Sequence, residues 1–137
     1  MAEMTEKKIF VVDDYPYAAY ITKKTISALS KHDCTVVDFE SPVLLLDRFK
    51  LEFEDILMVI TDYEMPNLRG DELIEELRKI KPDIKIVVMS AWLDTSKEED
   101  EMLIGKQVKA QHPDLILEKP FPENWVGKID TLLEQVA

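Results

Sequence analysis

Five short apolar runs alternate with segments of helical periodicity, and this alternation constrains the fold more than any other feature of the sequence. The runs Ile-Phe-Val-Val and Ile-Val-Val-Met are continuous rather than alternating, which is typical of parallel strands covered on both faces by helices. Strands are predicted at Lys8 to Val12, Thr35 to Phe39, Ile56 to Thr61, Ile84 to Met89 and Asp114 to Leu117.

Helix-start signals fall between these runs. Pro16 fits the first turn of a helix to about Leu29, and Ser41 with Pro42 fits the start of a second helix to about Lys50. Three more helices are predicted, one from Gly70 ending before Pro82, one from about Thr95, and one after Phe121 and Pro122. The fold class is therefore α/β, a (βα)5 doubly wound five-stranded parallel sheet, with an N-terminal tail at 1–7 and one domain at 8–137.

Composition narrows the functional classes. The chain has 137 residues, of which 46% are hydrophobic and 33% are charged, and it contains no apolar run long enough to cross a bilayer. Its formal net charge of -11 disfavours direct binding to nucleic acid. The short polar start and the single Cys34 fit a cytoplasmic protein without internal disulfides.

Polar residues follow the predicted strands. Asp13 and Asp14 follow the first strand, Asp62 the third, Ser90 the fourth and Lys119 the fifth. In a doubly wound sheet these positions share the carboxyl edge, where ligands collect. Three carboxylates with no neighbouring His or Cys favour a hard cation, and carboxylates with water ligands suit Mg²⁺ better than Ca²⁺. An ammonium and a hydroxyl beside a carboxylate nucleophile are suited to phosphoryl transfer.

Four motifs, "VVDDYP", "VITDYEMPNLRGDEL", "VVMSA" and "LEKPF", each stand at the end of a predicted strand. In this order and spacing they resemble the receiver domain of two-component response regulators, over nearly the whole chain. The resemblance implies a flavodoxin-like receiver fold in which Asp62 accepts a phosphoryl group from a phosphohistidine. It also implies that Asp13, Asp14 and Asp62 hold Mg²⁺ together with the backbone carbonyl of Glu64.

The resemblance assigns further roles at the strand ends. It implies that Ser90, the backbone N–H of Ala91 and Lys119 contact the phosphoryl group, and that Pro120 follows a cis peptide bond. Glu64 and Trp92 stand two positions beyond Asp62 and Ser90, where side chains in the family influence access to the phosphorylated residue.

The sequence departs from the family pattern at two places. Ile116 stands where most receivers carry an aromatic residue that takes part in the conformational readout, so another rearrangement is expected here. The segment between Ser90 and Lys119 is also longer than usual, which suggests an enlarged loop or helix.

The leading hypothesis is a signalling domain rather than an enzyme, although it can catalyse its own phosphorylation and dephosphorylation. Its expected partners are a sensor histidine kinase or histidine phosphotransfer protein and an unidentified downstream protein, and a homodimer stays open. No membrane partner is expected. The residues after Lys119 suffice for one helix, so an output domain would lie outside this sequence.

Two alternatives stay open. One is a receiver-like protein-binding module in which phosphorylation is silent; the intact acidic pair, Asp62, Ser90 and Lys119 argue against it, and Ile116 keeps it open. The other is a Mg²⁺-dependent aspartyl phosphohydrolase, because Glu64 stands two residues after Asp62, at the spacing of an acid/base in enzymes with an aspartate nucleophile.

Overall fold

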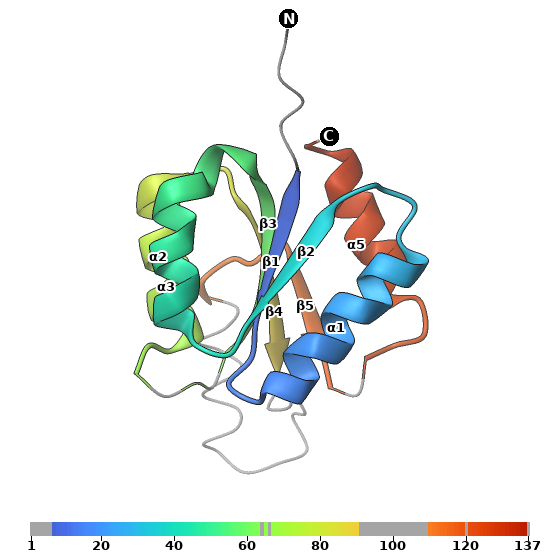
Figure 1. Ribbon diagram of the computed structural model, residues 1–137, viewed down its shortest axis with the longest axis horizontal. Coiled ribbons are helices and arrows are strands. Elements are labelled where there is room, and N and C mark those ends of the chain that lie inside the picture. Colours follow the sequence, from blue (N-terminus) through green and yellow to red (C-terminus); the bar gives the residue numbers. More distant parts are fainter. Residues whose placement is uncertain (1–6, 64, 66, 91–109, 120, 137) are drawn as a thin grey trace, which may run out of the picture.

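A computed structural model of the chain describes residues 7–63, 65, 67–90, 110–119 and 121–136. Its five strands form one sheet in the order β2-β1-β3-β4-β5, and every neighbouring pair is parallel (Figure 1). The strands are β1 (Lys8–Val12), β2 (Thr35–Phe39), β3 (Ile56–Asp62), β4 (Lys85–Ser90) and β5 (Leu115–Glu118). The predicted parallel sheet is confirmed.

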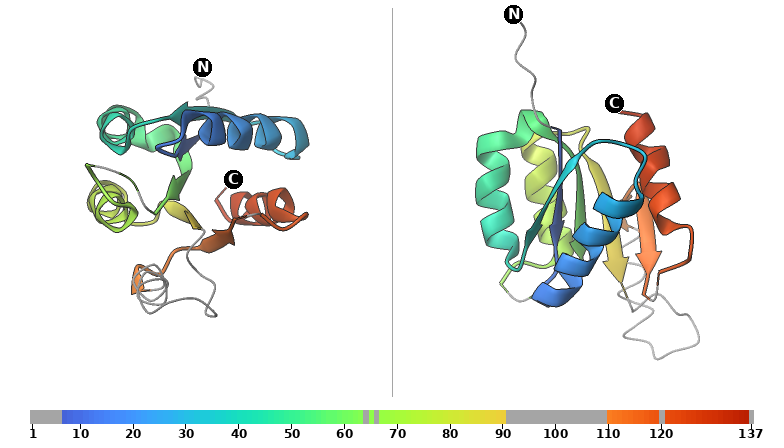
Figure 2. Two further views of the ribbon diagram at one scale, coloured as in Figure 1. Left: turned by 90° about the horizontal axis from the view of Figure 1, so that it is seen from below. Right: turned by 45° about the vertical axis from the view of Figure 1, so that its right-hand side comes forward.

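Helices cover both faces of the sheet. Helices α1 and α5 lie on one face and α2 and α3 on the other (Figure 2). Their bounds are α1 (Pro16–Leu29), α2 (Pro42–Glu52), α3 (Gly70–Ile80) and α5 (Trp125–Glu134), with a short 3₁₀ helix η1 (Phe53–Asp55) after α2. The helix predicted from Thr95 lies outside the described residues. The doubly wound arrangement agrees with the predicted fold class.

Local signals explain where these helices start and what they bury. Pro16 and Pro42 occupy first-turn positions, where a missing N–H costs nothing. Ser41 is the N-cap of α2, and its hydroxyl accepts a hydrogen bond from the Leu44 N–H at 3.4 Å. Helix α3 has one apolar face, which buries Leu73, Ile74 and Leu77 against the sheet.

The core consists of two apolar layers, one on each face of the sheet. Phe10, Phe49 and Leu77 belong to the layer under α2 and α3, and Ile26 and Ile129 belong to the layer under α1 and α5. Strand β3 lies at the centre and all of its residues are buried. Burial of each large apolar side chain contributes about 1.5–3 kcal/mol, so the strands that carry the site are anchored on both faces.

Several predicted boundaries were wrong by one to three residues. Strand β3 continues to Asp62, β4 runs one residue later than predicted, to Ser90, and β5 also starts and ends one residue later. The reason is tertiary pairing, because Asp62 pairs with Met89 and Ser90 with Glu118 in the sheet. Asp62 and Ser90 are thus the last residues of their strands.

Candidate functional site

The strand register brings the acidic residues of β1 and β3 together. Val12 pairs with Thr61, so Asp13 and Asp62 are neighbours at the carboxyl edge of the two central strands. Strand β1 lies between β2 and β3, and the helices that follow β1 and β2 cover opposite faces. This is the topological switch point of the sheet, where doubly wound proteins bind ligands.

Asp62 is nearly buried, with 9% of its surface exposed. Its Oδ1 accepts a hydrogen bond from the Tyr63 N–H at 3.0 Å and lies 3.5 Å from the Lys119 ammonium. The two contacts come from the residue after β3 and from the residue after β5. They fix the orientation of the carboxylate at the sheet edge.

Asp13 is 2% exposed and uses both carboxylate oxygens. Its Oδ1 accepts a hydrogen bond from the Tyr15 N–H at 3.0 Å, and its Oδ2 accepts one from Lys119 Nζ at 3.1 Å. Asp14 is exposed beside it. Lys119 therefore bridges the two buried carboxylates, as predicted for an ammonium at this edge.

Burial and crowding change the acidity of the site. Burial is the main cause that raises the pKa of Asp62 from 3.8 to about 6, with Asp13 adding to the rise and Lys119 opposing it. Partial burial and the adjacent Asp13 raise the pKa of Asp14. Burial lowers the pKa of Lys119, but Asp62 and Asp13 outweigh it and leave that pKa above its ordinary value. Repulsion from Asp13 thus contributes to the raised pKa values of both Asp14 and Asp62.

Ser90 and Lys119 are joined through the backbone. The Lys119 N–H donates to the Ser90 carbonyl at 3.0 Å, and Ser90 is buried at the end of β4. Five of the predicted residues thus share one edge: Asp13, Asp14, Asp62, Ser90 and Lys119. The predictions for Glu64, Ala91, Trp92 and Pro120 fall outside the described residues.

Sequence reasoning missed Thr61 as part of the site's support. Its hydroxyl donates to the Asp62 carbonyl at 2.8 Å and is fully buried. In the sequence Thr61 is a β-branched residue of an apolar strand, which signals only that it belongs to the sheet.

Gly70 begins α3, as predicted, and the structure gives a specific reason for a glycine at this position. A Cβ at this position would lie 2.8 Å from Tyr63 Cα and 3.0 Å from the Asp62 carbonyl oxygen. The Gly70 N–H also donates to the Tyr63 carbonyl at 2.9 Å. The left-handed residue of this loop is Asn67, with φ of 74°, rather than Gly70.

The donor set fits a hard divalent cation. Asp13, Asp14 and Asp62 each offer a carboxylate oxygen, and these three oxygens lie within 4.8 Å of one another. Among the described residues Lys119 supplies one ammonium against three carboxylates, which is consistent with the raised pKa of Asp62. Oxygen ligands of this kind suit Mg²⁺.

The doubly wound fold is that of a flavodoxin-like α/β domain. The acidic residues at its switch point form a group of carboxylate oxygens that could hold a cation. The chain belongs to the response regulator receiver domain family, whose family model matches residues 9–125. It is the receiver domain of a two-component response regulator, as the resemblance predicted. In the part of the chain that is described, every helix is too short or too polar to cross a bilayer.

Individual relatives agree with this assignment. A CheY homolog, a chemotaxis protein of Campylobacter jejuni, is 33% identical over 85 residues, which cover 61% of this chain and 63% of that protein. The transcriptional regulatory protein CreB of Escherichia coli is 25% identical over 134 residues, 97% of this chain and 53% of its own length. Two response regulators of Arabidopsis thaliana match 71% of this chain but only 15% and 17% of their own lengths.

Solved structures share the fold. A protein of Neptuniibacter caesariensis is 26% identical and superposes with a TM-score of 0.74, covering 93% of this chain and 87% of that one. A response regulator receiver domain protein of Clostridium thermocellum superposes with a TM-score of 0.73 at 20% identity, covering 94% and 92%. The second likeness concerns the fold alone.

Proposed function

We propose that this domain accepts a phosphoryl group on Asp62 from a phosphohistidine, in a Mg²⁺-dependent reaction, and thereby switches its interactions with other proteins. The observation that carries this proposal is the setting of Asp62. Its carboxylate is oriented at the switch point of the sheet, beside Asp13 and Asp14 and 3.5 Å from the Lys119 ammonium. With a pKa of about 6, Asp62 is mostly ionised at neutral pH and is available as a nucleophile.

The proposed step is an in-line displacement at phosphorus. An Asp62 carboxylate oxygen forms a bond to phosphorus while the phosphorus–nitrogen bond of the donor breaks, and the electron pair stays on the imidazole nitrogen. Lys119 lies close enough to move from Asp13 toward the transferred phosphoryl oxygens. Ser90, at the adjacent strand end, would supply a hydroxyl donor.

A magnesium ion would be held by the carboxylates of Asp13, Asp14 and Asp62, with the Glu64 carbonyl as a further predicted ligand. When bound, it would neutralise charge on the phosphoryl oxygens. The protein's own contribution is to hold the three carboxylates together, which their mutual repulsion opposes. The buried backbone contacts of Asp13 and Asp62 serve that purpose.

The expected phosphodonor is a sensor histidine kinase or a histidine phosphotransfer protein, and the downstream protein is unidentified. Membership of the receiver family indicates a signalling domain rather than a metabolic enzyme. We place it in the cytoplasm, where such donors act. Trp92, outside the described residues, is still predicted to screen the acyl phosphate, so Trp92→Ala should shorten the lifetime of the phosphorylated protein.

The test is incubation with Mg²⁺ and acetyl phosphate, followed by intact mass spectrometry. We expect the gain of one phosphoryl group in the wild type and no gain in Asp62→Asn or in the presence of a chelator. Asp38→Asn is the matched control, because Asp38 loses the same charge but lies on the edge strand β2, paired with Lys23 at 3.3 Å. It should be phosphorylated like the wild type.

Other outcomes would favour the alternatives. If neither phosphorylation nor binding of beryllofluoride, a phosphoryl mimic, is observed, the domain is a phosphorylation-silent binding module. Sustained release of phosphate from many small phosphoesters would instead indicate a phosphohydrolase. Equal mass gain in Asp62→Asn would show that another residue accepts the group.

A further inference from the structure

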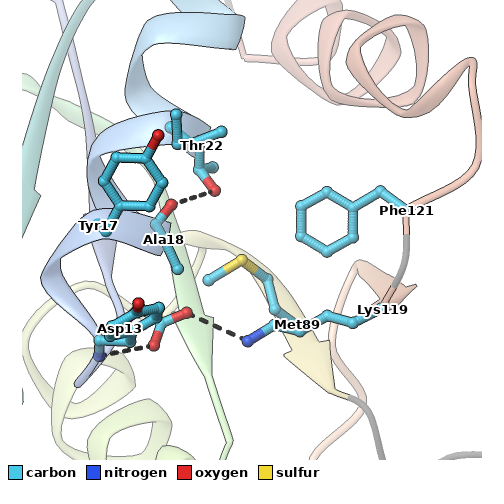
Figure 3. Close-up of a pocket in the computed structure, with 9 residues that line it drawn as sticks. Asp13, Tyr17, Ala18, Thr22, Met89, Lys119 and Phe121 are labelled. Carbon is cyan, nitrogen blue, oxygen red and sulfur yellow. Dashed lines mark hydrogen bonds and ion pairs between the residues drawn. The ribbon is translucent and has the colours of Figure 1, made fainter.

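A pocket of about 420 Å³ opens beside the acidic site, between α1 and the segment that follows β5 (Figure 3). Ala18 and Ile21 of α1, Met89 of β4 and Phe121 form much of its apolar wall, and Lys119 crosses its lower side toward Asp13. An apolar cavity of about 150 Å³ is enough to hold a benzene molecule. This pocket therefore has room for a phenyl ring.

Phe121 is one of three aromatic residues that line this space, and unlike Tyr15 and Tyr17 it stands only two residues from Lys119 in the chain. It is half-buried, and its ring packs edge-on against Trp125 at the start of α5, with 5.1 Å between ring centroids and 61° between ring planes. The same ring also borders the pocket. Two apolar environments are thus within its reach, the Trp125 contact and the pocket interior, and neither requires burial of a polar group.

Ile116 faces a different region. It is half-buried on β5 and packs against the core layer under α2 and α3, whereas Phe121 and Trp125 pack against the layer under α1 and α5. Strand β5 itself, with the sequence Leu-Ile-Leu-Glu, contains no aromatic residue. A ring that responds to the site on this side of the sheet must come from outside β5.

Lys119 provides the physical link between the acidic site and Phe121. It stands two residues before Phe121, its side chain borders the same pocket, and its ammonium contacts Asp13 at 3.1 Å and Asp62 at 3.5 Å. If the ammonium moves from Asp13 to a phosphoryl group on Asp62, its aliphatic stem must move along the pocket wall. That movement changes the space available to the Phe121 ring.

We infer that Phe121 is the side chain that reports the state of the acidic site, by moving from its contact with Trp125 into the pocket under α1 when Lys119 changes partner. The inference rests on the proposed phosphorylation of Asp62. Such a ring is a two-position element that a local charge change can bias. Its consequence is that the surface around Trp125 and the start of α5 differs between the two states.

The experiment uses the whole wild-type chain for the mass and NMR measurements, and the same chain with Trp92→Phe, in which Trp125 is the single tryptophan, for the fluorescence measurement. Phosphorylation by acetyl phosphate with Mg²⁺ is followed by intact mass, by Trp125 fluorescence and by NMR of ¹³C-labelled methionine methyl groups. We expect Trp125 emission to change as it loses the Phe121 ring, and the Met89 methyl signal to shift as the ring approaches it.

Three variants separate this mechanism from others. Phe121→Leu keeps an apolar side chain but removes the ring, and Ala18→Leu fills the pocket; both should still gain the phosphoryl mass but lose the Trp125 and Met89 responses. Ile116→Val should retain both responses. If Phe121→Leu or Ala18→Leu keeps the responses, or Ile116→Val abolishes them, the inference is wrong.

The phosphorylation measurement distinguishes the two proposals. A phosphoryl mass gain in the parent chain without any Trp125 or Met89 response would overturn the role of Phe121 and leave the proposed function intact. The absence of both mass gain and beryllofluoride binding would overturn the proposed function, and the role of Phe121 with it.

Discussion

Charged groups have different surroundings at the two edges of the sheet. At the amino edge, Glu52 contacts both Lys8 and Arg48, with its Oε2 2.7 Å from Arg48 Nε. Nearby, the Lys81 ammonium donates to the carbonyls of Phe53 and Ile56 at 3.0 and 2.7 Å. At this edge Glu52 has two cationic partners, and Lys81 has carbonyl acceptors although burial lowers its pKa. The carboxyl edge instead gathers three carboxylates around Lys119.

The difference appears as opposite pKa directions for two acids. Hydrogen bonds from Arg48 and Lys8 lower the pKa of Glu52, whereas burial raises the pKa of Asp62 to about 6. The surroundings of Asp62 disfavour its charged form, so the stability of the fold does not explain why a carboxylate lies there. The ion pairs of Glu52 at the amino edge therefore stabilise the fold, while the carboxyl edge holds an excess of negative charge that a bound cation can neutralise.

The largest expected effect concerns Asp62 in metal-free protein. Its pKa is higher in the folded state, so the folded protein holds more protons between pH 3.8 and about 6, and the free energy of unfolding falls as pH rises through that window. The loss is at most about 3 kcal/mol, since one pKa unit corresponds to about 1.4 kcal/mol. Urea unfolding in a chelator at several pH values measures it.

Asp62→Asn is the control for this slope. The variant should be more stable than the wild type at neutral pH, and the difference should shrink as the pH falls toward 4. If the free energy of unfolding of the variant depended on pH as that of the wild type does, the pKa of Asp62 would not be raised in the folded protein.

The next effect tests the close backbone approach at the carboxyl edge. Gly70→Ala should destabilise the protein by about 2 kcal/mol, because the new Cβ would meet the backbone of Tyr63 and Asp62. Gly127→Ala on α5 is the matched control, since nothing lies within 4 Å of its Cβ position, and it should stabilise by up to about 1 kcal/mol. Equal unfolding midpoints for the two variants would contradict this explanation.

The amino edge should respond with the opposite sign. Glu52→Gln should destabilise the protein by about 1 kcal/mol at neutral pH, because Lys8 and Arg48 lose their shared partner. The lowered pKa of Glu52 means that its stabilisation is present above its ordinary pKa of 4.5 and is lost as the pH falls below it. Thermal unfolding at neutral and acidic pH checks both statements. If the stabilisation from Glu52 decreased with rising pH, as is expected for Asp62, the contrast between the two edges would be wrong.

The smallest expected effect concerns the binding of Mg²⁺, the proposed metal. Because Asp62 must lose its proton to serve as a ligand, Mg²⁺ should bind about fourfold more weakly at pH 5.5 than at neutral pH. Calorimetric titration at the two pH values measures the ratio. Identical affinities would indicate that Asp62 is not a ligand, and Asp13 and Asp14 would then hold the ion without it.

Much of the fold was predictable because its signals are local. Continuous apolar runs require burial on both faces, and Pro16, Ser41 and Pro42 mark helix starts through backbone chemistry that acts within a few residues. Their positions after the predicted strands also led us to expect Asp13, Asp14, Asp62, Ser90 and Lys119 at one edge of the sheet before any geometry was known. The strand ends were less accurate, because β-pairing with a neighbour decides where a strand stops.

Local patterns in the sequence were enough to predict the order of strands and helices along the chain, the family, and the polar residues expected at the carboxyl edge. The acidity of Asp62, the bridging of Asp13 and Asp62 by Lys119, and the contact that excludes a side chain at Gly70 follow instead from the packing of the folded chain. These properties depend on distances between segments remote in the chain and on how much water reaches them. Local patterns carry neither kind of information, because burial and Coulomb interactions arise only when the segments pack together.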